Sequence, residues 1–108
     1  MDISNDTSQD VQYKVSGGGT PVGPHGRFVP SEDTSHWPVI AAKTVVSLPM
    51  TSKGPWRVYF VVNGEGFLAD ASADNDLVHL VPSGNSFRAD VRRVPHATHR
   101  AVDQARPA

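Results

Sequence analysis

The chain has 108 residues and no cysteine; 38% of it is hydrophobic, 19% is charged, and its formal net charge is −1 at pH 7. This length holds one domain, and without cysteine there is no disulfide, thiolate metal site or thiol nucleophile. The near-zero charge gives no general attraction to nucleic acid or to an anionic membrane, so neither is an expected partner. Nine glycines and nine prolines favour short strands joined by turns.

The N-terminal part of the chain predicts two strands. A short strand around Ile3 is followed by a turn over 5–8, and then Val11, Tyr13 and Val15 alternate with polar residues, as in a half-buried strand. No basic region followed by an apolar run marks a secretory signal, and no stretch has the length of a transmembrane helix. We therefore expect a cytoplasmic protein without membrane insertion.

Residues 16–38 predict a long irregular connection, because they contain glycine runs and four prolines that interrupt regular structure. A connection of this length is uncommon inside a compact domain and is usually functional or mobile. Trp37 lies near its end, where the indole either caps the sandwich or presents an aromatic platform to a ligand. This connection is therefore the first place to look for a binding function.

Strand signals dominate the chain from residue 39 onward. One strand is expected over 39–48, with the even-numbered side chains from Ile40 to Leu48 on a single face. Over 56–62 apolar residues alternate with outward-facing ones, and Asn63-Gly64 then signals a hairpin. Further strands are expected over 67–69, 77–81 and 87–91. Strands that recur at roughly 8–12 residues are typical of antiparallel sandwiches and barrels.

The predicted architecture is one antiparallel β-sandwich domain of the immunoglobulin-like type over residues 1–94, with a small β-barrel as the alternative. Two layers are expected because each strand has an apolar face that needs cover. Residues 95–108 show only weak helical periodicity and are expected to form a flexible or short helical tail.

One polar segment has the residue types of a calcium site. Oxygen-bearing side chains stand at alternate positions, and Ca²⁺ prefers several oxygen ligands from a short loop. Asn75 stands where a calcium-binding loop has glycine, however, and Val81 where it has a bidentate glutamate. The alternative is a polar turn, in which Asp and Asn bond the local backbone. The candidate metal ligands are Asp70, Ser72, Asp74 and Asp76.

Histidines give a second, weaker metal signal. His96 and His99 would share one face of a helix, and neutral imidazole is a common ligand of Zn²⁺, Cu²⁺ and Ni²⁺. A third ligand would have to come from elsewhere in the fold, and the alternative is a weakly basic tail. No segment resembles a nucleophile elbow or a phosphate-binding glycine loop, so we assign no catalytic residue.

Two strands present arginine on their polar faces. Arg88, Asp90 and Arg92 share one face of the last strand, and Arg57 with Tyr59 takes the equivalent face of a strand that we expect nearby. Arginine and tyrosine are enriched in recognition surfaces. The alternative is an ordinary solvated sheet face with cross-strand charge pairs.

The sequence therefore predicts a non-catalytic interaction module that binds a protein partner or associates with itself. The first alternative is a structural subunit of a homo-oligomeric assembly, and the second is a metal-binding protein or a metal-dependent enzyme. No cofactor is expected, apart from Ca²⁺ at the aspartate segment. The candidate binding residues are Trp37, Arg57, Tyr59, Arg88 and Arg92.

Overall fold

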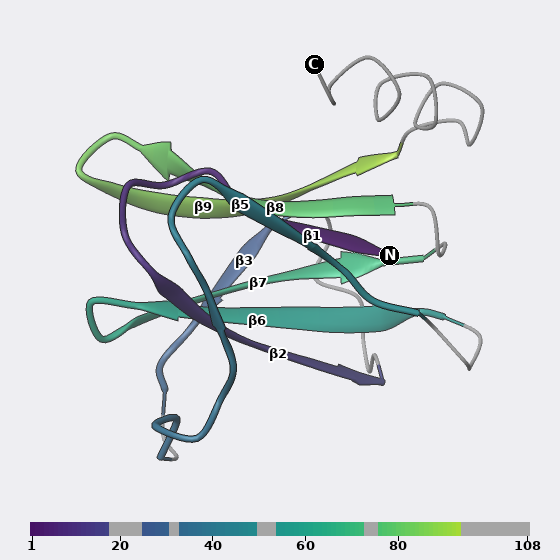
Figure 1. The fold of residues 1–108 in the computed structure, drawn as a ribbon, viewed down its shortest axis with the longest axis horizontal. Coiled ribbons are helices and arrows are strands. Elements are labelled where there is room, and N and C mark those ends of the chain that lie inside the picture. The colour runs from purple at the N-terminus through teal and green to yellow at the C-terminus, as the bar shows by residue number, and fades with distance from the viewer. Residues whose placement is uncertain (18–24, 31–32, 50–53, 73–75, 94–108) are drawn as a thin grey trace.

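Nine strands form two facing sheets in the computed structural model, which describes residues 1–17, 25–30, 33–49, 54–72 and 76–93 (Figure 1). The strands are β1 (Asp2–Asn5), β2 (Val11–Gly17), β3 (Gly26–Phe28), β4 (Val39–Ile40), β5 (Thr44–Ser47), β6 (Trp56–Val62), β7 (Glu65–Ala71), β8 (Asp76–Ser83) and β9 (Ser86–Arg93). One sheet has the order β5-β1-β8-β9 and the other β3-β7-β6-β2-β4. The predicted all-β sandwich is confirmed, and the described strands form two sheets instead of one closed barrel.

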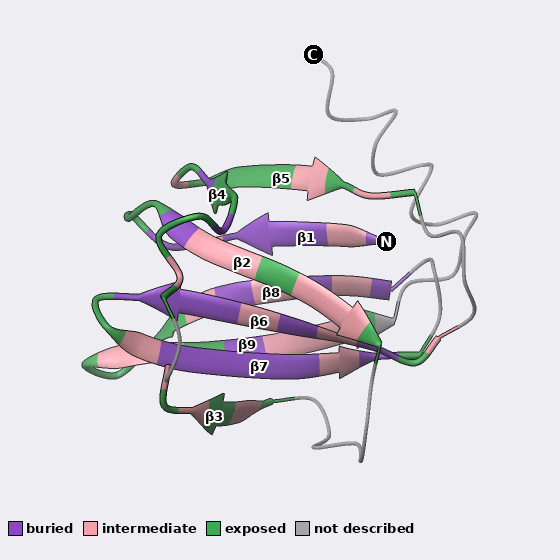
Figure 2. Cartoon of the chain, turned by 90° about the horizontal axis from the view of Figure 1, so that it is seen from below, coloured by how far each residue is buried: buried purple, intermediate pink, exposed green. Residues whose placement is uncertain are grey.

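Among the described strands, the pairing is antiparallel except between β1 and β8. β1 lies between β5 and β8 and runs parallel to β8, with Ile3 opposite Val78. This parallel pair joins the first and the eighth of the nine described strands, and it brings the N-terminus into the middle of the four-stranded sheet (Figure 2). Long-range pairing of this kind has no local sequence signal.

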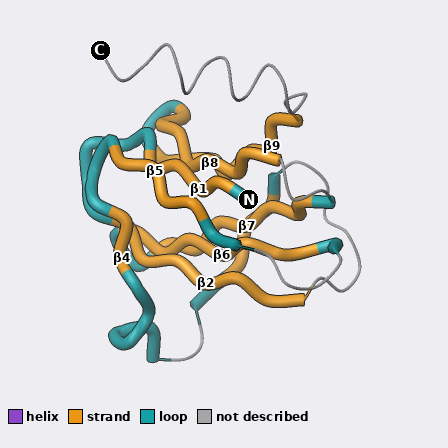
Figure 3. Tube along the Cα trace, turned by 45° about the vertical axis from the view of Figure 1, so that its right-hand side comes forward, coloured by secondary structure: helices purple, strands orange, loops and turns teal. Residues whose placement is uncertain are grey.

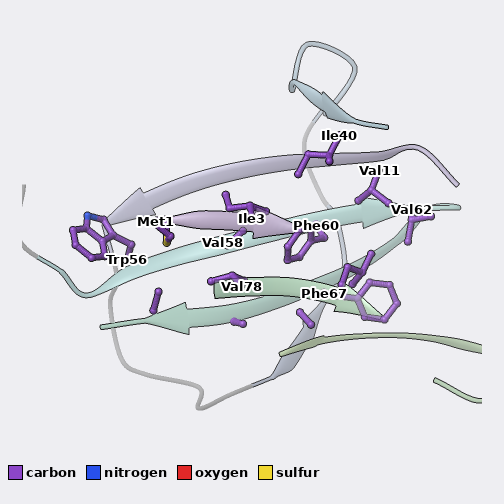
Figure 4. Close-up of a cluster of buried hydrophobic side chains, with 14 residues drawn as sticks. Met1, Ile3, Val11, Ile40, Trp56, Val58, Phe60, Val62, Phe67 and Val78 are labelled. Carbon is purple, nitrogen blue, oxygen red and sulfur yellow. The ribbon is translucent and has the colours of Figure 1, made fainter. Parts of the chain in front are cut away.

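The core lies between the two sheets. In β6 the side chains of Val58 and Phe60 are fully buried, as the alternation predicted, and Ile3 and Val78 meet them from the facing sheet (Figure 4). Complete burial of one such side chain stabilises the fold by about 1.5–3 kcal/mol. The hairpin after β6 is also confirmed, since Asn63 and Gly64 have φ angles of 53° and 76°, the positive values that a tight two-residue turn needs.

The single strand predicted over 39–48 is wrong. The chain leaves the five-stranded sheet after β4, turns at Lys43 with a φ of 60°, and enters the four-stranded sheet as β5. Two polar contacts hold this crossing: the Ala42 amide donates to Asp10 Oδ1 at 3.1 Å, and Lys43 Nζ donates to the Asp6 carbonyl at 2.9 Å. An unbroken alternation of apolar residues therefore spans two strands in different layers.

The predicted turn after the first strand is built around Asn5, which is fully buried. Its amide nitrogen donates to the carbonyls of Gln9 at 2.7 Å and Ile40 at 2.9 Å. Its amide oxygen accepts from the Thr7 amide and the Thr7 hydroxyl. All four hydrogen-bonding positions of the amide are used, and the bond to Ile40 joins the two sheets.

Residues 16–38 are not irregular throughout. β3 lies within this range and pairs antiparallel with β7 at the edge of the five-stranded sheet. Beyond β3, the chain crosses the outer face of that sheet on its way to β4 (Figure 2). β9 is the last described element, and the tail expected over residues 95–108 lies outside the described part. The structure contains no helix, within the residues described, that is long and apolar enough to cross a membrane.

Candidate functional site

A pocket of about 230 Å³ opens on the outer face of the five-stranded sheet, under the segment that connects β3 to β4. Its floor comes from the paired strands β2 and β6, which lie side by side in Figure 3 and whose outward side chains alternate with core residues. Its walls come from β3 and from residues 33–38. The pocket is lined by Lys14, Ser16, Phe28, Pro30, Thr34, Trp37 and Tyr59. Two of the predicted binding residues, Trp37 and Tyr59, thus meet at one site.

Three aromatic rings define the shape of the pocket. Tyr59 points outward from β6, since Val58 and Phe60 on either side point into the core. The Phe28 ring meets the Tyr59 ring edge-on, with centroids 5.3 Å apart and planes at 84°. The centroid of the Trp37 ring lies 6.3 Å from that of the same Tyr59 ring, and the two planes are tilted by 59°. Such offset or edge-on pairs are the favoured arrangement of aromatic rings, so the cluster has a defined geometry.

The segment that carries Trp37 is anchored to β2. Gln12 Nε2 donates to the Thr34 carbonyl at 2.6 Å, and the Thr34 hydroxyl donates to Gln12 Oε1 at 3.2 Å. A turn then closes between Thr34 and Trp37, whose amide donates to the Thr34 carbonyl at 2.9 Å. Finally, the Tyr13 amide donates to the Pro38 carbonyl at 3.0 Å. These bonds hold the indole against the sheet, where only 7% of Trp37 is exposed.

An aspartate stabilises the start of the same turn. The backbone amide of Ser35 donates to Asp33 Oδ1 at 2.9 Å, and this hydrogen bond lowers the pKa of Asp33 below its ordinary value. Asp and Asn favour turns because their side chains accept such local bonds. The turn is therefore stabilised by the local hydrogen bond to Asp33 and by the hydrogen bonds with Gln12 on β2.

Two cationic side chains lie at or beside the pocket: Lys14 lines it, and Arg57 stands on β6 close to Tyr59. Lys14 Nζ lies 5.5 Å from the centre of the Trp37 ring, within the range of a cation–π contact. Arg57 forms a two-point contact with Asp70, with Nε to Oδ1 at 2.8 Å and Nη2 to Oδ2 at 3.3 Å. The hydrogen bond to Asp70 raises the pKa of Arg57, and Tyr59 adds to the effect. Arg57 thus binds Asp70 beside Tyr59 and does not line the pocket.

The five predicted binding residues do not form one surface. Trp37, Arg57 and Tyr59 belong to the outer face of the five-stranded sheet, whereas Arg88 and Arg92 stand on β9 of the other sheet. Arg88 and Arg92 are exposed and alternate with buried Ala89, so they face away from the core on the opposite side of the molecule. Arg88 also pairs with Asp90 on its own strand at 2.8 Å.

The predicted calcium ligands lie in different environments. Asp70 faces outward and is bound by Arg57, while Asp76 is 1% exposed and accepts from the Ser72 amide at 3.0 Å. Asp74 lies outside the described residues, as do His96 and His99. Within the described part of the chain, no three His, Cys, Asp or Glu side chains come together as a metal site. Calcium binding therefore stays a prediction from the sequence.

The sequence analysis did not identify Phe28 as a site residue, nor Gly66, which leaves room for the Phe28 ring. Phe28 pairs with Gly66 across β3 and β7, and a Cβ on Gly66 would stand only 2.7 Å from the Phe28 ring. Phe28 also borders a more open hollow of about 380 Å³ beyond β3, next to the exposed Arg27–Glu65 ion pair. The only signal was that Phe28, like Trp37, is an aromatic residue within the glycine- and proline-rich segment over 16–38.

Comparisons with known proteins give no family for this chain: no family model, no curated protein and no solved structure matches it.

Proposed function

We propose that the chain is a non-catalytic binding module, and that the pocket beneath Trp37 receives an apolar or aromatic side chain of a protein partner. The observation that carries the proposal is the ring cluster of Phe28, Tyr59 and Trp37 around a pocket of about 230 Å³. Tyrosine and tryptophan supply large contact areas at recognition sites and lose little conformational entropy. The pocket is held in place by the Gln12–Thr34 bonds, so binding does not have to order it first.

The charge at the pocket supports an acidic or neutral ligand. The ammonium group of Lys14 already occupies a position over the Trp37 ring. A cationic ligand would be repelled by that charge, whereas a carboxylate beside the seated side chain would be attracted. The partner sequence that suits this site therefore has an aromatic or large aliphatic residue next to an acidic one.

The finer architectural assignment belongs to the same proposal. An immunoglobulin-like arrangement is supported by the two-layer packing and by the contribution of both ends of the described chain to one sheet. Domains of that type bind partners through their loops and sheet faces. A cytoplasmic location remains an expectation from the sequence.

A pair of probes with the same ring and opposite charge tests the site. We expect indole-3-acetate to bind more tightly than tryptamine, with chemical-shift changes in a protein NMR spectrum that centre on the indole N–H of Trp37. Lys14→Gln should remove the preference for the acid, because it removes the charge and keeps much of the side-chain length.

The control is Val29→Ala, which changes a side chain that is 86% exposed and does not line this pocket. It should leave binding of both probes unchanged. If neither probe shifts the Trp37 resonance, the pocket is not a binding site for such groups and the proposal is wrong.

A further inference from the structure

None of the described strands pairs with the outer side of β5, where its backbone presents N–H and C=O groups. Within the described part of the chain, β5 pairs with β1 alone, and Figure 2 shows it as the largely exposed outermost strand of its sheet. The Leu48 amide donates to the Met1 carbonyl at 2.9 Å, and the Met1 ammonium donates to the Leu48 carbonyl at 3.0 Å. These two bonds show that Met1 and Leu48 are a hydrogen-bonded pair. They therefore fix which residues of β5 bond to β1 along the rest of the ladder.

This alternation decides which backbone N–H and C=O groups of β5 point away from β1. In an antiparallel ladder, hydrogen-bonded and non-bonded pairs alternate, so Val46 and Thr44 follow Leu48 in bonding to β1. Val45 and Ser47 are the non-bonded positions. Their N–H and C=O groups therefore point away from β1, toward the open side of the sheet.

The other three sheet edges have features that discourage pairing. β9 carries charged side chains, among them Arg88, Asp90 and Arg92, and packs against β7 of the facing sheet. β3 is three residues long and bears the Arg27–Glu65 ion pair, and β4 has only two residues. Charge and shortness are the usual means by which sheet edges avoid each other.

β5 has no such charge. Its four residues are Thr, Val, Val and Ser, and Val45 is 44% exposed. Charged groups next to β5 are bound on its β1 side or at the preceding turn: Lys43 donates to the Asp6 carbonyl at 2.9 Å, and the Asp2 carboxylate on β1 accepts from the Ser47 hydroxyl at 2.7 Å. A strand that has no charged residue of its own, and whose Val45 and Ser47 each offer an outward N–H and C=O, can pair with the same strand of a second copy.

We propose that two copies of this chain associate through β5, antiparallel across a two-fold axis that passes beside Val46. In this register Val45 of each copy lies opposite Ser47 of the other. Both residues offer an outward N–H and C=O, so the two such pairs form four backbone hydrogen bonds and join the two four-stranded sheets into one. Isologous contacts of this kind close on themselves and end at a dimer. The surface is separate from the pocket, so this inference does not depend on the proposed function.

Sedimentation equilibrium across a range of protein concentrations tests the association. We expect a reversible monomer–dimer equilibrium, and a dissociation constant that rises by about tenfold or more in Val45→Lys, which places two charges at the contact. Val29→Lys is the matched control, because it also adds a lysine at an exposed valine, and Val29 follows β3 at the edge of the other sheet. A wild-type chain that is monomeric at every concentration, or a dimer that Val45→Lys leaves intact, would overturn the proposal.

The absence of native cysteine allows a direct test of register. Single variants Val45→Cys and Ser47→Cys are mixed under mild oxidation. The register places residue 45 of one copy across from residue 47 of the other, at a Cα separation of about 5.5 Å that suits a disulfide. We expect the mixed disulfide to form faster than either homodimer. Equal rates for all three products would reject this register even if a dimer exists.

Discussion

The ring of Phe28 lies over Gly66, its partner across the β3–β7 ladder, in the space where any other residue would place a side chain. A Cβ at position 66 would stand 2.6 Å from the Phe28 carbonyl oxygen and 2.7 Å from the ring. Because the same ring forms one wall of the aromatic pocket, the shape of the candidate site depends on a glycine that does not line it.

The first prediction follows from that contact. Gly66→Ala should push β3 and the Phe28 ring away from Tyr59 and destabilise the fold by ~1–3 kcal/mol, the usual cost of overpacking. Denaturant unfolding measures the loss, and the probe titration should show weaker binding. Gly17→Ala is the control, since a Cβ there meets nothing within 4 Å. A stability loss as large in Gly17→Ala as in Gly66→Ala would contradict this account.

The second prediction concerns the Arg57–Asp70 pair behind Tyr59. Its side chains are 16% and 9% exposed, against 63% and 42% for Arg27 and Glu65. A double-mutant cycle with Arg57→Met and Asp70→Asn should give a coupling of ~1–3 kcal/mol, because a shielded two-point contact is screened little by water.

The exposed pair serves as the comparison for that cycle. Arg27→Met with Glu65→Gln should give a coupling of ~0.2–1 kcal/mol, the range for exposed ion pairs. Raising the salt concentration should reduce the exposed coupling more than the shielded one. Equal couplings in the two cycles would show that burial does not distinguish these pairs.

The third prediction is a loss of stability in acid. Burial raises the pKa of Asp6, but hydrogen bonds from the Ser4 hydroxyl and from His79 outweigh it, so the pKa is lowered overall from its ordinary value of 3.8. A lowered pKa in the folded state means that the carboxylate stabilises the fold above pH 3.8. That contribution is lost as the pH falls through the lower, folded-state value.

The measurement is the free energy of unfolding as a function of pH, in the wild-type chain and in Asp6→Asn. The variant should be less stable near neutral pH and should lose less stability between pH 5 and pH 2, a window of about three units around the ordinary carboxyl range. Asp2→Asn is the control, because it makes the same substitution at another N-terminal aspartate, on the strand that precedes Asp6. Parallel pH curves for the wild type and Asp6→Asn would mean that Asp6 does not contribute to acid sensitivity.

Local patterns in the sequence were enough to predict the elements that depend on local physics. Val58 and Phe60 alternate with Arg57 and Tyr59 because a strand has a period of two, and burial of one set makes that alternation visible. Asn63-Gly64 predicted a hairpin because both residues accept the positive φ of a tight turn. Strand identity, the alternating faces and the all-β sandwich follow from such signals.

The arrangement of these strands depended on contacts between distant residues. The alternation over 39–48 continues without interruption through Lys43, so it could not show that the chain changes sheets there. Arg57 and Arg88 have the same strand pattern, yet they belong to opposite faces because β6 and β9 lie in different layers. Which sheet a strand joins is decided by its partners, and those are specified by packing across the whole core.

The aromatic site shows the same division. The sequence by itself determined that Trp37 lies in a long connection and that Tyr59 faces away from the core, because composition and strand period are local properties. Only the tertiary structure decided that Phe28 joins them: its place requires the gap left by Gly66 on β7. The meeting of Trp37 with Tyr59 likewise requires the anchor from Gln12 to Thr34, 22 residues apart in the chain. A pocket made from four separate segments exists only when the fold brings them together.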